Sequence, residues 1–112
     1  MDDVFKALAD PSRRALLDQL HQNNGQTLNE LCRHVDMTRQ GITKHVALLI
    51  QAGLIVPLWD GREKLHYLNP APLKHISERW IDKYLRRIRQ SLNELEQRLT
   101  ELHPAEPLSR LT

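Results

Sequence analysis

The chain has 112 residues, of which 40% are hydrophobic and 27% are charged. This length supports one modest hydrophobic core, so we expect a single domain. Lysine plus arginine (16) exceeds aspartate plus glutamate (14) by only two, so the net charge says little about a nucleic-acid partner, and the positions of the charges must decide.

Several classes of protein are not expected. The first three residues lead into an amphipathic stretch and not into a signal peptide, and no apolar run reaches membrane-spanning length. The single cysteine, Cys32, cannot form an intrachain disulfide, which favours a cytoplasmic location. Paired carboxylates, a nucleophile beside a base motif and a glycine-rich phosphate loop are missing from the sequence. We therefore expect no enzyme, no cofactor and no membrane partner.

Two short helices are expected at the start of the chain. Asp10 and Pro11 mark the break between them, because proline is favourable at the first position of a helix. A cluster of two asparagines and Gly25 ends the second helix. The apolar sides of these helices consist of Val4, Phe5 and Leu8 in the first and of Leu16, Leu17 and Leu20 in the second.

A helix-turn-helix is expected next. Thr27 and Glu30 have the spacing of a capping box, which predicts a short helix with a buried side, and residues 36–38 form the turn. The following helix, from about residue 38 to residue 52, has two different faces at 100° per residue. The buried side of the first helix is Leu28, Leu31, Cys32 and Val35; the second helix has Ile42, Val46 and Leu49 on its core face and Gln40, Thr43, Lys44 and Ala47 on the other, with Arg39 and His45 at the flanks.

The polar face of this second helix is a candidate for reading DNA. Its side chains carry amide, hydroxyl and ammonium groups at the N-terminal end of the helix, the end that such motifs insert into the major groove. A solvated surface would look similar. Gly41 inside the helix costs about 1 kcal/mol relative to alanine, which is easier to understand where a phosphate backbone approaches, although simple tolerance is the alternative.

A β-hairpin, or wing, is expected after Gly53. Residues 55–59 and 64–68 are typical of strands, Asp60 and Gly61 form a turn signal, and Pro57 makes the first strand an edge strand. Arg62 and Lys64 near the tip would supply cations to a phosphate or a minor groove. Standing alone, they would be read as a solubilising tip with nearby acidic partners.

These segments together resemble the ArsR-type winged-helix repressors over residues 4 to about 70. The resemblance implies a dimeric bacterial or archaeal transcription regulator, in which Arg39, Gln40, Thr43 and Lys44 correspond to base- and phosphate-contacting positions and His45 is a lesser candidate. The matching segments are Leu8-Ala9-Asp10-Pro11-Ser12-Arg13-Arg14, Leu28-Asn29-Glu30-Leu31-Cys32, Ile42-Thr43-Lys44-His45-Val46-Ala47-Leu48-Leu49, Ala52-Gly53-Leu54-Ile55 and Gly61-Arg62. The full set of expected DNA-binding residues is Thr38, Arg39, Gln40, Thr43, Lys44, His45, Arg62 and Lys64.

The sequence departs from the metal-sensing members of that family. Their Cys-x-Cys pair would fall at Thr27 and Asn29, neither of which is a thiolate, and no two histidines are three or four residues apart. We expect no metal site, although spacing alone does not exclude one formed across a dimer. The effector remains open.

The C-terminal helix, from about Pro72 to Leu102, predicts assembly. Apolar residues recur at steps of four and three, and this heptad seam is too long for so small a core to cover. We therefore expect a homodimer. The expected dimerisation residues are Val4, Phe5 and Leu8 at the start of the chain and Ile81, Leu85, Ile88, Leu92, Leu95 and Leu99 in the seam.

The expected fold is mainly α with a small β-hairpin: a winged helix-turn-helix over residues 1–70, a long dimerisation helix over 71–103 continuous with it, and a flexible tail over 104–112. The function that follows is sequence-specific binding of double-stranded DNA at an imperfect palindrome, as a dimeric transcriptional repressor. Activation in place of repression stays open. The alternative is a winged-helix module that binds proteins and has no DNA site.

Overall fold

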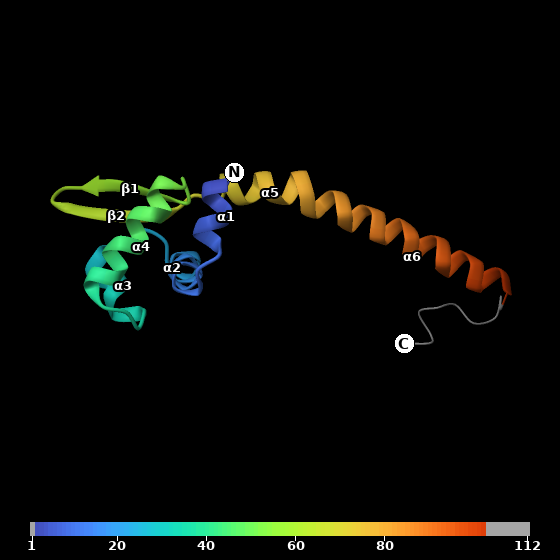
Figure 1. Ribbon diagram of the computed structural model, residues 1–112, viewed down its shortest axis with the longest axis horizontal. Helices are drawn as coiled ribbons and strands as arrows, with labels where there is room; N and C mark the ends of the chain where they lie inside the picture. Colours follow the sequence, from blue (N-terminus) through green and yellow to red (C-terminus); the bar gives the residue numbers. More distant parts are fainter. Residues whose placement is uncertain (1, 103–112) are drawn as a thin grey trace. The chain divides into compact units, whose positions relative to one another are not determined.

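A computed structural model describes residues 2–102 (Figure 1). The chain divides into two compact units, one ending at Leu73 and the next beginning at Lys74. The flexible tail expected over 104–112 lies outside the described residues. The elements are α1 (Asp2–Leu8), α2 (Pro11–Gln22), α3 (Leu28–His34), α4 (Arg39–Gln51), β1 (Ile55–Asp60), β2 (Glu63–Leu68), α5 (Ala71–Ile76), a π-helical turn η1 (Ser77–Ile81) and α6 (Asp82–Leu102).

The break between α1 and α2 lies where the sequence predicts it. The Asp10 carboxylate accepts the backbone N–H groups of Ser12 and Arg13 at 2.8 and 3.2 Å, and Pro11 begins α2. The Arg13 guanidinium reaches back and donates to the carbonyls at the end of α1, to Ala7 at 2.9 Å and to Lys6 at 3.0 Å. One side chain therefore bonds two carbonyls in the last turn of α1 and fixes the corner between the two helices.

Side-chain caps define both helices of the helix-turn-helix. Thr27 and Glu30 form the predicted capping box at the start of α3. Thr38 caps α4 by accepting the N–H of Gly41 at 3.0 Å. A Cβ at Gly41 would lie 3.1 Å from the Thr38 Oγ1, so the glycine leaves room for the cap. The structure thus supplies a local reason for this glycine that the sequence did not suggest.

The hairpin forms as predicted, with each strand one residue longer toward the turn. β1 and β2 pair antiparallel from Ile55 with Leu68 to Asp60 with Glu63, leaving a two-residue loop of Gly61 and Arg62. Gly61 has a φ of +62° and no non-glycine residue described has a positive φ, the pattern of a type II′ turn. The tip of the wing is therefore a tight, defined turn.

A buried polar contact fixes the base of the wing to the loop after α2. Gln26 and His66 exchange backbone hydrogen bonds of 3.2 and 2.8 Å, and the His66 ring Nδ1 lies 2.9 Å from the Gln26 carbonyl oxygen. Because a carbonyl only accepts, Nδ1 carries the proton. Gly25, at a φ of +76°, lies against the Tyr67 ring, where a Cβ would come within 2.8 Å. Periodicity did not predict this contact.

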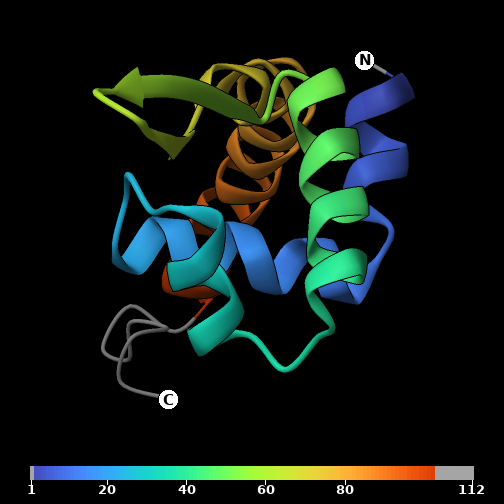
Figure 2. The same cartoon turned by 90° about the vertical axis from the view of Figure 1, so that its left-hand side faces the viewer.

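The core of the first unit is built from the apolar stripes of its helices and from the strand entrance. Figure 2 shows α4 beside α1 and the hairpin to one side of the helices. The predicted stripes of α2 and α4 are buried, whereas on α3 only Leu31 is fully buried and the other three predicted residues are half-buried. The residues with no exposed area are Leu16, Leu20, Leu31, Ile42, Leu49 and Leu54.

The second unit is helical along its whole described length, but it is not one regular α-helix. A π-helical turn interrupts it, in which the Asp82 N–H bonds the Ser77 carbonyl five residues back. The predicted bounds of about Pro72 to Leu102 agree with this helical segment, but the prediction of one regular α-helix is wrong, because the π-helical turn divides the segment into α5, η1 and α6. No described residue of α6 is buried.

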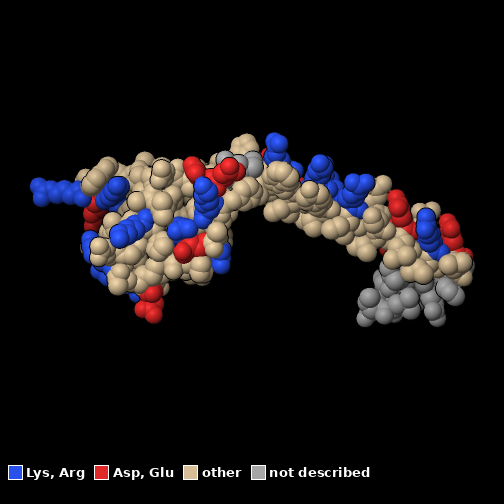
Figure 3. Space-filling view, viewed as in Figure 1, with Lys and Arg blue, Asp and Glu red and all other residues tan. Residues whose placement is uncertain are grey.

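Charge is unevenly distributed along α6. Lysine and arginine gather over its first half and acidic groups toward its C-terminal end (Figure 3). The apolar seam of α6 is exposed from Leu85 to Leu95, with exposed fractions between 42% and 54%, and Leu99 is half-buried. Among the helices of residues 2–102, none is both long enough and apolar enough to span a bilayer.

Candidate nucleic-acid interface

The exposed face of α4 carries the predicted polar side chains. Gln40, Thr43 and Lys44 are all exposed, while Ile42, Val46 and Leu49 on the opposite side have between 0% and 4% of their surface accessible. The Thr43 hydroxyl donates to the Arg39 carbonyl one turn back at 2.8 Å, which fixes its rotamer and leaves its oxygen lone pairs outward. This face is free of other parts of the first unit.

A groove of about 490 Å³ lies between the helix-turn-helix and the wing. Its apolar lining comes from both helices, including Leu28, Val46 and Ile50, and the indole of Trp59 adds a wall from β1. Three cationic side chains line the same groove, namely Arg39 from the start of α4 and Arg62 and Lys64 from the wing, against one carboxylate, Glu63. Residues separated by more than twenty positions therefore present positive charge to one strip of surface.

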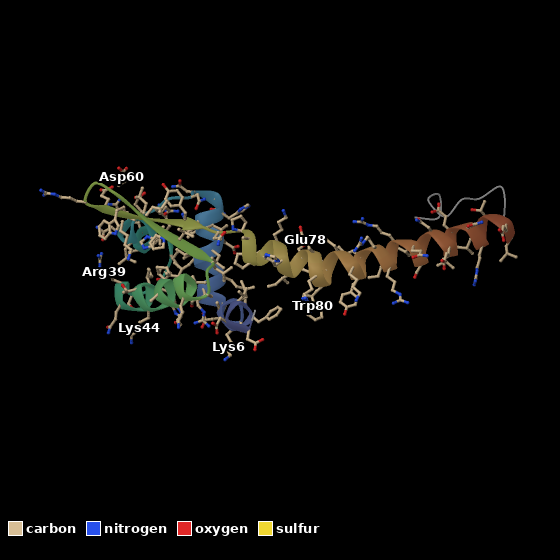
Figure 4. All side chains as sticks on the ribbon, turned by 90° about the horizontal axis from the view of Figure 1, so that it is seen from above. Lys6, Arg39, Lys44, Asp60, Glu78 and Trp80 are labelled. Carbon is tan, nitrogen blue, oxygen red and sulfur yellow. The ribbon has the colours of Figure 1, made fainter. Side chains whose placement is uncertain are left out.

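Arg39 is positioned by a neighbour on α3. Its guanidinium donates to the side-chain oxygen of Asn29, which directs it along the groove. Figure 4 shows Arg39 on the side of α4 that faces the wing and Lys44 on the opposite side. Arg39 and Lys44 therefore present their charges to different sides of α4.

His45 faces the α1–α2 corner. Its Nδ1 lies 3.4 Å from an Arg13 guanidinium nitrogen. Because arginine only donates, the His45 Nδ1 is the acceptor. Arg13 also lies 3.9 Å from the Asp10 carboxylate. Partial desolvation raises the pKa of Asp10, but the N–H donors of Arg13 and Ser12 and the Arg13 charge outweigh it and hold that pKa below its ordinary value.

The eight predicted DNA-binding residues fall into three groups. Arg39, Thr43, Arg62 and Lys64 line the groove, whereas Gln40 and Lys44 lie on the exposed face of α4 outside it. The remaining two, Thr38 and His45, already have partners within the unit: the hydroxyl of Thr38 caps α4 and the ring of His45 meets Arg13.

Trp59 is the groove residue that sequence reasoning missed. It was assigned to a strand and given no role, because in a strand of mixed side chains an aromatic residue is typical. Strand alternation contains the missing signal: Ile55, Pro57 and Trp59 lie on one face of β1, and the first of them is buried in the core.

The predicted dimerisation residues differ in accessibility. Val4 is only 7% exposed and packs inside its own unit, where α1 contacts α2 and α4, whereas Phe5 is 46% exposed. Leu8 is half-buried. Ile81, at the end of η1, is 49% exposed, and the α6 residues of the set are exposed except for Leu99, which is half-buried.

Metal-binding side chains do not gather in the described part of the chain. Cys32 is half-buried and unpaired, and across residues 2–102 no group of three or more His, Cys, Asp or Glu side chains is placed to hold an ion. The expectation of no metal site rests on the thiolate spacing in the sequence.

Comparisons with known proteins agree on one family. Residues 8–57 match the model of a helix-turn-helix domain. The chain is 38% identical over 87 residues to the uncharacterised HTH-type transcriptional regulator YuzN of Bacillus subtilis, covering 72% of this chain and 95% of YuzN. It is 31% identical over 85 residues to the transcriptional repressor SdpR of the same organism, covering 76% of this chain and 92% of SdpR.

Solved structures give the same result. An ArsR family transcriptional regulator superposes with a TM-score of 0.64 at 31% identity, over 83% of this chain and 94% of that one. An ArsR-like transcriptional regulator from Rhodococcus sp. RHA1 superposes with a TM-score of 0.65 at 25% identity, over 94% of this chain and 93% of that one. These proteins are regulators and not enzymes.

Proposed function

The chain belongs to the ArsR-type winged helix-turn-helix transcriptional regulators, and from that premise we propose that it is a dimeric repressor that binds an imperfect palindrome in double-stranded DNA. The observation that carries the proposal is that cationic side chains from α4 and from the wing lie on one surface. Arg39 on α4 and Arg62 and Lys64 on the wing line the same groove, beside the exposed polar face of the recognition helix α4.

The residues of this surface divide into two roles. Gln40, Thr43 and Lys44 lie on the exposed face of α4, where amide, hydroxyl and ammonium groups match the donor and acceptor pattern of base edges in the major groove. Arg39, Arg62 and Lys64 are placed to contact phosphates, which supplies affinity independent of sequence. Thr38 and His45 support the interface by holding α4 in position.

Dimerisation is supported by the exposed seam of α6. Six leucine and isoleucine side chains at heptad spacing form a stripe too apolar for a solvated helix, and a second copy of the chain would cover it. The exposed Phe5 on α1 offers additional apolar surface. Two copies related by a twofold axis would present two recognition helices, so the target is expected to be a pair of inverted half-sites spaced by one helical turn of DNA or a multiple of it.

Repression follows from occupancy. A dimer seated on a promoter prevents polymerase from binding the same DNA, and one relative, SdpR, is named a transcriptional repressor. Such a protein acts where the DNA is, so the cytoplasm is its proposed location.

The test is selection of bound fragments from the source genome, followed by binding titrations of a selected fragment and a scrambled duplex of equal length at low and moderate salt. We expect the protein to bind the selected fragment more tightly than the scrambled duplex, and we expect both affinities to fall as the salt concentration rises. Equal affinity for the two duplexes would contradict a sequence-specific regulator. Absence of binding even at low salt would favour a winged-helix module that binds proteins.

A further inference from the structure

Trp59 is an unusual residue for a free protein surface. Its indole is 69% exposed, more than that of any other large apolar side chain described in the first unit. A large aromatic ring left in water loses the stabilisation that burial would give, and tryptophan is enriched where one molecule contacts another.

Trp59 lies on the groove side of the wing. Its cross-strand partner in the hairpin is Lys64, and both side chains line the groove with Arg39 and Thr43 of α4. Leu58, the preceding residue, is 54% exposed but does not line the groove, because adjacent side chains of a strand point to opposite faces. The most exposed aromatic ring of the unit therefore lines the same groove as Arg39, Arg62 and Lys64, the cations proposed to bind phosphate, with Glu63 as the one carboxylate among the lining residues.

We propose that Trp59 is a further DNA-contacting residue, whose ring packs on the deoxyribose of the strand that lies between α4 and the wing. The neighbouring Arg39, Arg62 and Lys64 neutralise phosphates, whereas an indole cannot. Between successive phosphates a DNA strand presents the deoxyribose, whose carbon atoms offer an apolar surface on which an aromatic ring can pack. Trp59 thus adds an apolar contribution to the affinity that does not depend on salt.

This inference rests on the proposed function, and the chain offers a direct optical test. Trp59 and Trp80 are the two tryptophans, and Trp80 belongs to the second unit. In a Trp80→Phe variant all tryptophan emission comes from Trp59, and titration with a selected genomic fragment is expected to change its intensity and wavelength. Unchanged emission from this variant while the fragment demonstrably binds would overturn the inference.

Affinity measurements at several salt concentrations separate the ring from the charges around it. Trp59→Ala is expected to weaken binding by about fivefold to tenfold while leaving the slope of log affinity against log salt unchanged. Arg62→Ala is expected to lower the magnitude of that slope by about one. Trp59→Phe retains an aromatic ring and is expected to recover most of the affinity.

Leu58→Ala is the matched control, because it removes an exposed apolar side chain from the same strand on the other face. It is expected to bind DNA as the wild type does. If Trp59→Ala binds as tightly as Leu58→Ala, or changes the salt slope as Arg62→Ala does, the assignment is wrong although the proposed function stands. If the wild type binds neither a selected nor a scrambled duplex, the proposed function fails and this inference fails with it.

Discussion

The first unit, which contains the helix-turn-helix and the wing and is called the winged unit below, and α6 both have apolar residues at helical spacing, but these residues are buried in the winged unit and mostly exposed in α6. In the winged unit the stripes of α2 and α4 meet one another, and side chains such as Leu16 and Leu49 have no exposed area. In α6 the apolar side chains at heptad spacing are exposed except for the half-buried Leu99, and no described residue of that helix is buried. Periodicity therefore identifies the face that must be covered, while only the topology of the chain determines whether its own residues can cover it.

The largest effect is expected from a substitution in the winged core. Leu49→Ala removes a fully buried side chain and should lower the free energy of unfolding by about 2–5 kcal/mol, measured by urea denaturation at fixed protein concentration. The neighbouring Leu48→Ala is the control, because Leu48 is 46% exposed, and it should change the free energy by less than about 1 kcal/mol. Equal losses for the two variants would contradict the assigned core.

A charge in the α6 seam tests the other half of the comparison. If the seam is a dimer interface, Leu92→Glu places two unpaired carboxylates in it and should raise the dimer dissociation constant at least about a hundredfold. Sedimentation equilibrium measures this effect directly. Asn93→Glu adds the same charge one residue outside the seam and should leave the dimer intact. Dissociation by both variants, or by neither, would argue against the seam as the interface.

Substitutions on α4 and the wing refine the functional side of the winged unit. Lys44→Ala and Gln40→Ala should each reduce the free energy of binding to the selected DNA fragment by about 1–3 kcal/mol more than that to scrambled DNA, because they remove base contacts. Arg62→Ala should weaken binding to the selected and the scrambled duplex by the same factor, because a phosphate contact carries no sequence information. Parallel fluorescence-anisotropy titrations give the ratio of the affinities for the selected and the scrambled duplex. A similar ratio for all three variants would contradict this division of roles.

The smallest effect concerns the Asp10 cap. Its pKa is lowered in the folded unit, so the ionised carboxyl stabilises the fold above the ordinary aspartate pKa, and that contribution is lost as the pH falls below about 4. Asp10→Asn keeps a cap acceptor but cannot titrate. Urea midpoints measured between about pH 6 and pH 2.5 should therefore fall less steeply for this variant than for the wild type. Identical pH profiles would show that the carboxyl does not contribute.

Local chemistry made much of the winged unit predictable. Helix starts at Pro11 and Leu28 follow from side chains that cap their own neighbours, and the wing turn at Gly61 follows from a backbone conformation that glycine favours. The core face of α4 follows from a period of 3.6 residues. Each of these signals lies within a few residues, so one sequence suffices to read it.

The groove could be predicted only in part. Its cations were identified one by one, but the path from Arg39 to Lys64 crosses a helix end, a loop and a strand, and the angle of each is set by packing. The aromatic wall at Trp59 and the buried contact between Gln26 and His66 were not predicted, because neither follows a local pattern. The inward bond of His45 to Arg13 likewise joins residues 32 positions apart.

By itself, the sequence determined the starts of α2 and α3 with their caps, the wing and the core faces of α2 and α4, because propensity, capping and periodicity act between near neighbours. The tertiary structure alone decided which exposed side chains share a surface: it brought Arg39, Trp59 and Lys64 to one groove and turned His45 toward Arg13. The physical reason is that long-range contacts depend on how the stripes pack against one another, and that packing is a property of the whole unit and not of any segment.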